Sequence, residues 1–214
     1  MSDTFFDAVG VIYGLAGVVT LAQLVKGWRS FWGDGLTRAD ELLAWRIAFF
    51  VAHPFFVLLH ELGHVAAVLQ SGGHVAMLSW RVYWGFVVPV GEFTPLQDWW
   101  IALAGNVASL LAGALFFAGG LAAMRLRQPV RAVLLVVGFA EMLFTLVGYP
   151  LISLGLFGDW DVIYDFSQTP VASAATAVAH GGLVVALLAW GRNQSVGKIL
   201  ATVERGGTAD PARE

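Results

Sequence analysis

The residues His60-Glu61-Leu62-Gly63-His64 bring two imidazoles and a carboxylate together at a spacing that suits metal-assisted hydrolysis. On a helix, residues four apart share one face and lie about 6 Å apart along the axis, so both imidazoles can bind one metal ion. Glu61 is then placed to accept a proton from a metal-bound water. The chain has no Cys, so any further ligand must be a His or a carboxylate. This pattern predicts a Zn²⁺ site with His60 and His64 as ligands and Glu61 as the general base.

The chain around this pattern is unusually poor in charge. It has 214 residues, 58% of them hydrophobic and 13% charged, and its mean hydropathy is +0.73. Soluble domains carry about 25% charged residues, and several apolar runs here reach the ~20 residues that cross a bilayer. We therefore expect a polytopic membrane protein whose main partner is the lipid bilayer. The net charge of −3, without a basic face, excludes nucleic acid as a main partner.

The apolar runs predict an all-α membrane protein with about five transmembrane helices. Residues 1–190 are expected to form a single transmembrane domain, and the polar tail 191–214 to be mobile apart from a short helix around 195–204. Three polar, ionisable residues in one turn of a membrane helix are costly to insert, which favours a functional site over a packing contact. The predicted spans cover residues 5–25, 42–69, 99–123, 130–154 and 170–190.

The segment 72–95 does not resemble a sixth span. Its apolar part is short, it is bounded by the pair Gly72-Gly73 and by Gly91 and Pro95, and Arg81 stands near its middle. Its richness in Val and aromatic residues favours a short membrane-associated β-hairpin after the HELGH helix. An irregular interfacial loop with aromatic anchors is the alternative.

Basic residues are distributed unevenly between the two sides that five spans define. One side receives only Arg81 near a span end, and the other receives eight positive residues. The positive-inside rule then places the N-terminus outside and the C-terminus in the cytoplasm of a multi-pass protein of the bacterial cytoplasmic membrane. The eight residues are Lys26, Arg29, Arg38, Arg125, Arg127, Arg131, Arg192 and Lys198.

Beyond HELGH, the stretches QSGGHVAML and TPLQDWWIALAGNVASLLAG are similar to parts of the site-2 protease family of intramembrane zinc metalloproteases. The longer stretch resembles the family helix with Ala-Gly-Pro-x-x-Asn: Ala104 and Gly105 are retained, whereas Asn106 and Ser109 replace the family's Pro and Asn. The resemblance covers roughly residues 45–165, without an inserted peptide-binding PDZ module. It implies a compact, divergent zinc metalloprotease whose substrate is a transmembrane or membrane-associated protein. Family members hold zinc nearer the cytoplasm, whereas the charge distribution places HELGH nearer the outside.

A catalytic zinc usually has three protein ligands, and several residues are candidates for the third. The end of the fourth span and the loop after it lie on the same side as His64, which favours the aspartates of that loop. GDWDVIY resembles, loosely, the Asp-Gly-x-x-Leu stretch of compact family members, with Asp159 at the ligand position. Asp161 is the alternative. The lower-ranked candidates are Asp165, Glu141, His53 and His180.

Three polar residues inside the spans have other expected roles. His53 lies two turns from His60, about 10 Å away, so we expect a hydrogen-bonded interior histidine. His180 is expected to have the same role. Glu141 either orients a ligating histidine or packs against a neighbouring donor.

The leading functional hypothesis is peptide-bond hydrolysis within or at the edge of the membrane, with Glu61 as general base. The residues 74–90 then hold an extended substrate segment at a strand edge. A membrane zinc hydrolase acting on a lipid or an amide is the first alternative, and a non-enzymatic metal-binding membrane protein is the second. The sequence does not indicate the substrate or the oligomeric state.

Overall fold

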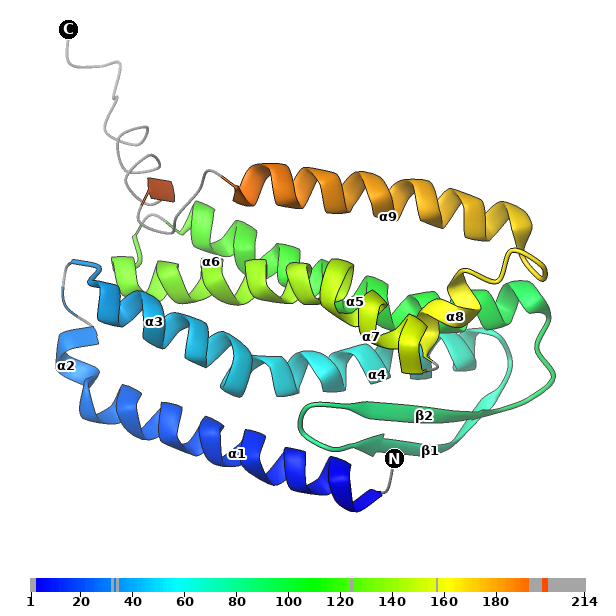
Figure 1. Ribbon diagram of the computed structural model, residues 1–214, viewed down its shortest axis with the longest axis horizontal. Helices are drawn as coiled ribbons and strands as arrows, with labels where there is room; N and C mark the ends of the chain where they lie inside the picture. The colour runs from blue at the N-terminus through cyan, green and yellow to red at the C-terminus, as the bar shows by residue number, and fades with distance from the viewer. Residues whose placement is uncertain are drawn as a thin grey trace, which may run out of the picture.

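The computed structural model describes residues 3–31, 33, 35–123, 125–156, 158–192 and 198–199. Long helices lie side by side along the longest axis, and a β-hairpin covers one end of them (Figure 1). The first half of the chain forms α1 (Asp3–Lys26), α2 (Trp28–Phe31), α3 (Arg38–Ile47), η1 (Ala48–Ala52), α4 (His53–Gln70), β1 (His74–Trp80) and β2 (Gly85–Val90). The second half forms α5 (Pro95–Ala122), α6 (Gln128–Leu143), η2 (Phe144–Gly148), α7 (Tyr149–Leu156), α8 (Asp159–Ile163) and α9 (Pro170–Gly191).

Within the described residues, five helical stretches are long and apolar enough to cross a membrane. Two of them are interrupted by the single π-helical turns η1 and η2, which continue the helix rather than break it. The prediction of a mostly helical chain with five such stretches and one small hairpin is confirmed. The predicted tail helix around 195–204 lies almost entirely outside the described residues. The stretches are Asp7–Lys26, Arg38–Gln70, Pro95–Ala122, Gln128–Leu154 and Pro170–Gly191.

Two of the long helices begin at side-chain caps that the sequence supplies. Thr37 and Asp40 form a reciprocal capping box at the start of α3, so the second stretch begins four residues before the predicted residue 42. Thr94 and Gln97 form the same motif before α5, where Pro95 occupies the first turn. Proline is favoured there because its missing N–H has no helical partner in the first turn.

Helix α5 lies between α4 and α6 and packs against both. Glycine makes the first contact possible, because a Cβ added at Gly63 would lie 2.6 Å from the carbonyl oxygen of Ala104. At Gly138 of α6 an added Cβ would collide with the backbone of Phe117 in α5. The close approach of these backbones brings the HELGH turn of α4 directly against α5.

The hairpin is antiparallel, with His74 opposite Val90 and Trp80 opposite Gly85. This confirms the predicted hairpin and excludes the irregular loop. Two contacts fix it to the helices: Trp80 Nε1 donates to Pro54 O at 2.9 Å, and Arg81 Nη1 donates to Asp7 Oδ1 at 2.8 Å.

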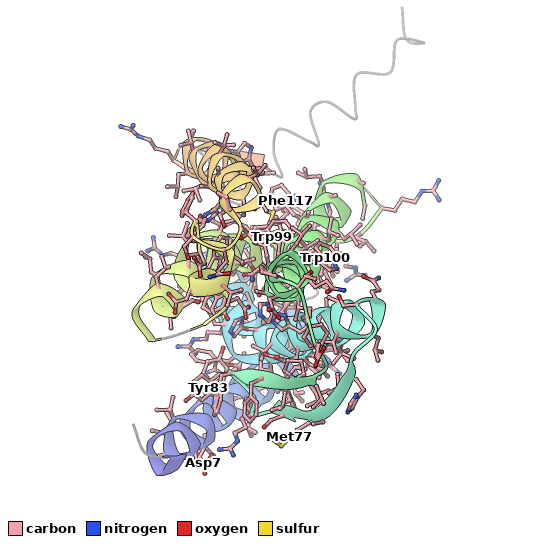
Figure 2. The ribbon with its side chains drawn as sticks, turned by 90° about the vertical axis from the view of Figure 1, so that its right-hand side faces the viewer. Asp7, Met77, Tyr83, Trp99, Trp100 and Phe117 are labelled. Carbon is pink, nitrogen blue, oxygen red and sulfur yellow. The ribbon has the colours of Figure 1, made fainter. Side chains whose placement is uncertain are left out.

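Figure 2 shows the end of the molecule that carries this hairpin. Tyr83, in the turn between the strands, stacks on Tyr13 of α1 with ring centroids 5.8 Å apart. Met77 of β1 points away from the helices and is half exposed. The turn of the hairpin is therefore held against α1, while the outer face of β1 is uncovered.

Candidate metal centre

Three potential metal ligands converge where α4, α5 and α8 meet. His60 Nε2 lies 3.0 Å from His64 Nε2 and 3.0 Å from Asp159 Oδ2. The distance from His64 Nε2 to the same oxygen is 3.2 Å. Within the described residues this is the one group of three or more His, Asp or Glu side chains whose donor atoms could hold a single ion.

The spacing of the three atoms would suit a metal ion, and zinc is one example. Tetrahedral zinc binds nitrogen and oxygen ligands at about 2.0–2.2 Å, which separates neighbouring ligands by about 3.3 Å. The ring of His64 is also set for metal binding, because its Nδ1 lies 2.7 Å from the carbonyl oxygen of Ile101. A carbonyl accepts only, so Nδ1 carries the hydrogen and Nε2 of the neutral ring presents a lone pair. Lone pairs facing one another across 3 Å require a proton or a cation between them.

Asp159 reaches this point because it is the first residue of α8. Gly158 precedes that helix, and the N–H of Trp160 donates to Ser153 Oγ at 3.0 Å, which ties the helix start to α7. When a proton rather than a cation lies among the three atoms, burial raises the pKa of the Asp159 carboxyl, but hydrogen bonds and positive charge from His60 and His64 outweigh it, so the pKa lies well below its usual value. The residue therefore presents an ionised carboxylate.

Asp161, the alternative ligand, has a different task. Its Oδ2 accepts a hydrogen bond from the backbone N–H of Gly158 at 3.2 Å and so caps α8. Asp165, a lower-ranked candidate, lies outside the group as well. Its Oδ1 accepts hydrogen bonds from Ser167, which lower the pKa of the carboxyl. The structure therefore brings Asp159, and neither of the other two aspartates, to the histidines.

Two further side chains hold Asp159, and the sequence did not reveal either role. Tyr149 Oη donates to Asp159 Oδ2 at 3.0 Å, and its ring packs edge-on against His60. Asn106 Nδ2 donates to the same oxygen at 3.2 Å. Asn106 was noticeable only as the departure from the family proline, and Tyr149 gave no signal. Such partners orient a metal ligand and fix its charge state.

Gly105 lets the two imidazoles lie against α5. A Cβ added there would lie 2.5 Å from His64 Nε2 and 2.8 Å from His60 Nε2, closer than such contacts permit. This gives a physical reason for glycine at position 105.

Gly105→Ala should therefore displace both imidazoles and lower zinc affinity by about tenfold or more, the scale of lost support around a metal ligand. Zinc content and competition with a chromogenic chelator measure the change. Gly119→Ala is the matched control, because a Cβ at Gly119 of the same helix meets nothing within 4 Å. Equal affinity in the two variants would contradict the placement of the imidazoles.

Glu61 lies at the junction of two cavities. It is 5% exposed, and a Cβ added at Gly85, the first residue of β2, would come within 2.7 Å of its Cγ. A vestibule of about 1010 Å³ opens beside the hairpin and α8. An inner cavity of about 370 Å³ extends along α4 towards η1 and η2. Both are lined in part by Glu61, Trp84, Gly85, Tyr149 and Ile152.

The remaining polar residues of the spans have partners away from the metal centre. His53 Nδ1 lies 3.3 Å from Glu141 Oε2, which confirms His53 as a hydrogen-bonded interior histidine. Glu141 thus contacts His53 and Thr145 rather than a ligating histidine. His180 contacts the Tyr164 hydroxyl through Nδ1 and the Leu146 carbonyl through Nε2, as expected for an interior histidine. His53 and His180 therefore have hydrogen-bond partners outside the group formed by His60, His64 and Asp159.

Comparison of the chain with protein-family models, curated proteins and solved structures found no match in any of the three. The chemistry of the site therefore rests on the residues and contacts of this chain alone.

Proposed function

We propose that the protein is a zinc-dependent protease that cleaves a membrane-embedded or membrane-adjacent protein segment. The observation that supports this most directly is the convergence of His60, His64 and Asp159 within 3.0–3.2 Å of one another. Glu61 follows His60 on the same helix and faces both cavities. Three ligands with an adjacent carboxylate are the arrangement of zinc hydrolases. A metal that serves only stability or transport does not need that carboxylate.

Insertion in a bilayer is part of this proposal. Among the described residues, eight large apolar side chains of α1 and α9 are each 60% or more exposed, which water does not favour but lipid does. They are Val11, Ile12, Leu15, Val18, Val25, Val171, Val178 and Val185.

The residues divide the chemistry between them. His60, His64 and Asp159 would hold zinc, which when bound polarises a substrate carbonyl and makes water easier to deprotonate. Glu61 accepts the proton of the attacking water and passes it to the leaving amine. Tyr149 and Asn106 keep the Asp159 carboxylate turned towards the histidines.

An extended substrate would lie along β2. The hairpin has two strands, so one edge of β2 is unpaired among the described residues, and Gly85, Phe86, Val87 and Pro89 line the vestibule. A helical substrate hides its carbonyls in its own hydrogen bonds. Pairing with an open strand edge keeps the segment extended and presents its carbonyls to the metal centre.

The proposed orientation places the hairpin, α8 and the vestibule outside the cytoplasm. In Figure 1 the hairpin and α8 lie at one end of the long helices, and α2 lies at the other. Arg29 and Arg38, among the eight positive residues, belong to that second end.

Single-cysteine variants in intact cells test this orientation. Asp161→Cys should react with a membrane-impermeant maleimide added outside, and Asp34→Cys should react only after lysis. Labelling of position 34 from outside would show that the protein has the opposite orientation to the one proposed.

The proposed activity is tested by reconstituting the purified protein in liposomes with candidate single-span proteins. We expect cleavage that stops on chelation and returns on addition of zinc. Release of fatty acid from the lipid, with the proteins intact, would favour a lipid hydrolase instead. Zinc-dependent binding with neither product would favour a non-enzymatic metal protein.

A further inference from the structure

A second cluster of buried polar side chains lines the inner cavity where the cavity meets the two π-helical turns. His53, Glu141 and Thr145 line this cavity and are 9%, 4% and 4% exposed. His53 directly follows η1, and Thr145 belongs to η2, which begins three residues after Glu141. Single π-helical turns inside helices occur often at functional sites. The metal centre does not account for this group.

The Glu141 carboxylate accepts fewer and weaker hydrogen bonds than it can. Its Oε2 lies 3.3 Å from His53 Nδ1, and its Oε1 accepts from Thr145 Oγ1 at 3.3 Å. Both distances exceed the usual range, which ends at about 3.2 Å for N–H donors and about 3.0 Å for O–H donors, and an ionised carboxylate has about four acceptor positions. No Lys or Arg is among the described residues that line the cavity. In apolar surroundings such a carboxylate favours a further donor, and a cationic donor most.

The cavity leads from this carboxylate to the proposed catalytic residues. His60 and Glu61 line the same cavity as Glu141, and His53 and His60 are two helical turns, about 10 Å, apart. Its remaining wall is largely apolar, with Phe56, Val57 and Phe144 among the lining residues. A long side chain with an apolar stem and a charged end fits such a cavity. Lysine and arginine have that form.

We propose that the inner cavity is a specificity subsite that takes one basic side chain of the substrate and binds its charged end at Glu141. The inference rests on the proposed function, because the peptide segment that carries this side chain is the one held at the metal centre. The vestibule also favours a positively charged substrate, because Asp98, Asp161 and Asp165 line it and no described Lys or Arg does. A basic segment is therefore attracted on entry as well as at the end of the inner cavity.

Two probes that bind metal through the same group separate the subsite from the metal centre. Nα-acetyl-lysine hydroxamate and Nα-acetyl-norleucine hydroxamate differ only in the ammonium at the end of the side chain. Calorimetry with zinc-loaded full-length protein measures both affinities. The lysine probe should bind about tenfold or more tighter, as expected for a charge-assisted hydrogen bond formed in a buried site.

Glu141→Gln should reduce that ratio to near one and leave the affinity for the norleucine probe unchanged, which also shows that the variant is folded. Glu92→Gln, in the exposed loop after β2, should keep the wild-type ratio. Thr145→Val is the second variant and should lower the ratio in part. A ratio near one in the wild-type protein would overturn the subsite even if Glu141→Gln did not fold. If the norleucine probe still bound in a zinc-dependent way, the proposed metal centre would be supported and only the subsite would be wrong. If neither probe bound, both the metal centre and the subsite would be contradicted.

Discussion

Replacing Glu61 with Gln should lower kcat for peptide cleavage by roughly 10²–10⁴-fold, the contribution of a positioned general base, while about one zinc per chain stays bound. The amide has the shape of the carboxylate but cannot accept the proton. Glu61 is not one of the three residues whose ligand atoms converge, so the substitution leaves the ligand set intact. Cleavage of a reconstituted single-span substrate and metal analysis of the same sample measure the two quantities.

Two comparisons make this result specific. Glu92→Gln removes a carboxylate from an exposed loop and should leave both cleavage and zinc unchanged. If Glu61→Gln retained zinc and cleaved at the wild-type rate, Glu61 would not be the base. A protein that only carries metal would show wild-type zinc transport in this variant and no cleavage in either protein.

The sequence predicted those parts of the structure that depend on local pattern. The HELGH turn lies on α4 because four-residue spacing and apolar surroundings both require a helix there. The hairpin was predictable because the pair Gly72-Gly73 on one side, and Gly91 and Pro95 on the other, bound a short run rich in Val and aromatic residues. Asp159 lies beside His60 and His64. Its place at the break after the fourth span and the likeness of GDWDVIY to a family stretch were the two sequence features that favoured it over Asp161.

Contacts between distant parts of the chain were beyond the sequence. Tyr149 reaches Asp159 because η2 and α7 continue α6 without a break, and no local pattern indicates a π-helical turn. The partner of Glu141 depends on how α6 packs against η1 and α4. The need for Gly105 becomes visible only when the two imidazoles are seen against α5.

Asp159→Asn should lower zinc affinity by more than the roughly 10–100-fold that follows loss of a residue that merely orients a ligand, whereas Asp161→Asn should change it by a few-fold at most. The two substitutions are chemically identical and two residues apart on α8. Asp159 Oδ2 lies 3.0 Å and 3.2 Å from the two imidazole nitrogens. The substitution Asp159→Asn therefore removes a negative charge directly beside the proposed zinc ion. Asp161 caps the helix through an oxygen that asparagine retains.

Zinc affinity is measured by competition with a chelator, because that readout needs no substrate and remains valid if the activity is not proteolytic. A large loss in Asp161→Asn with none in Asp159→Asn would move the third ligand by two residues. Wild-type affinity in both variants would mean that α8 supplies no ligand. The expected result, a large loss in Asp159→Asn alone, would follow from the different positions of the two aspartates: Asp161 fixes the start of α8, and the first residue of α8 is the one that reaches the histidines.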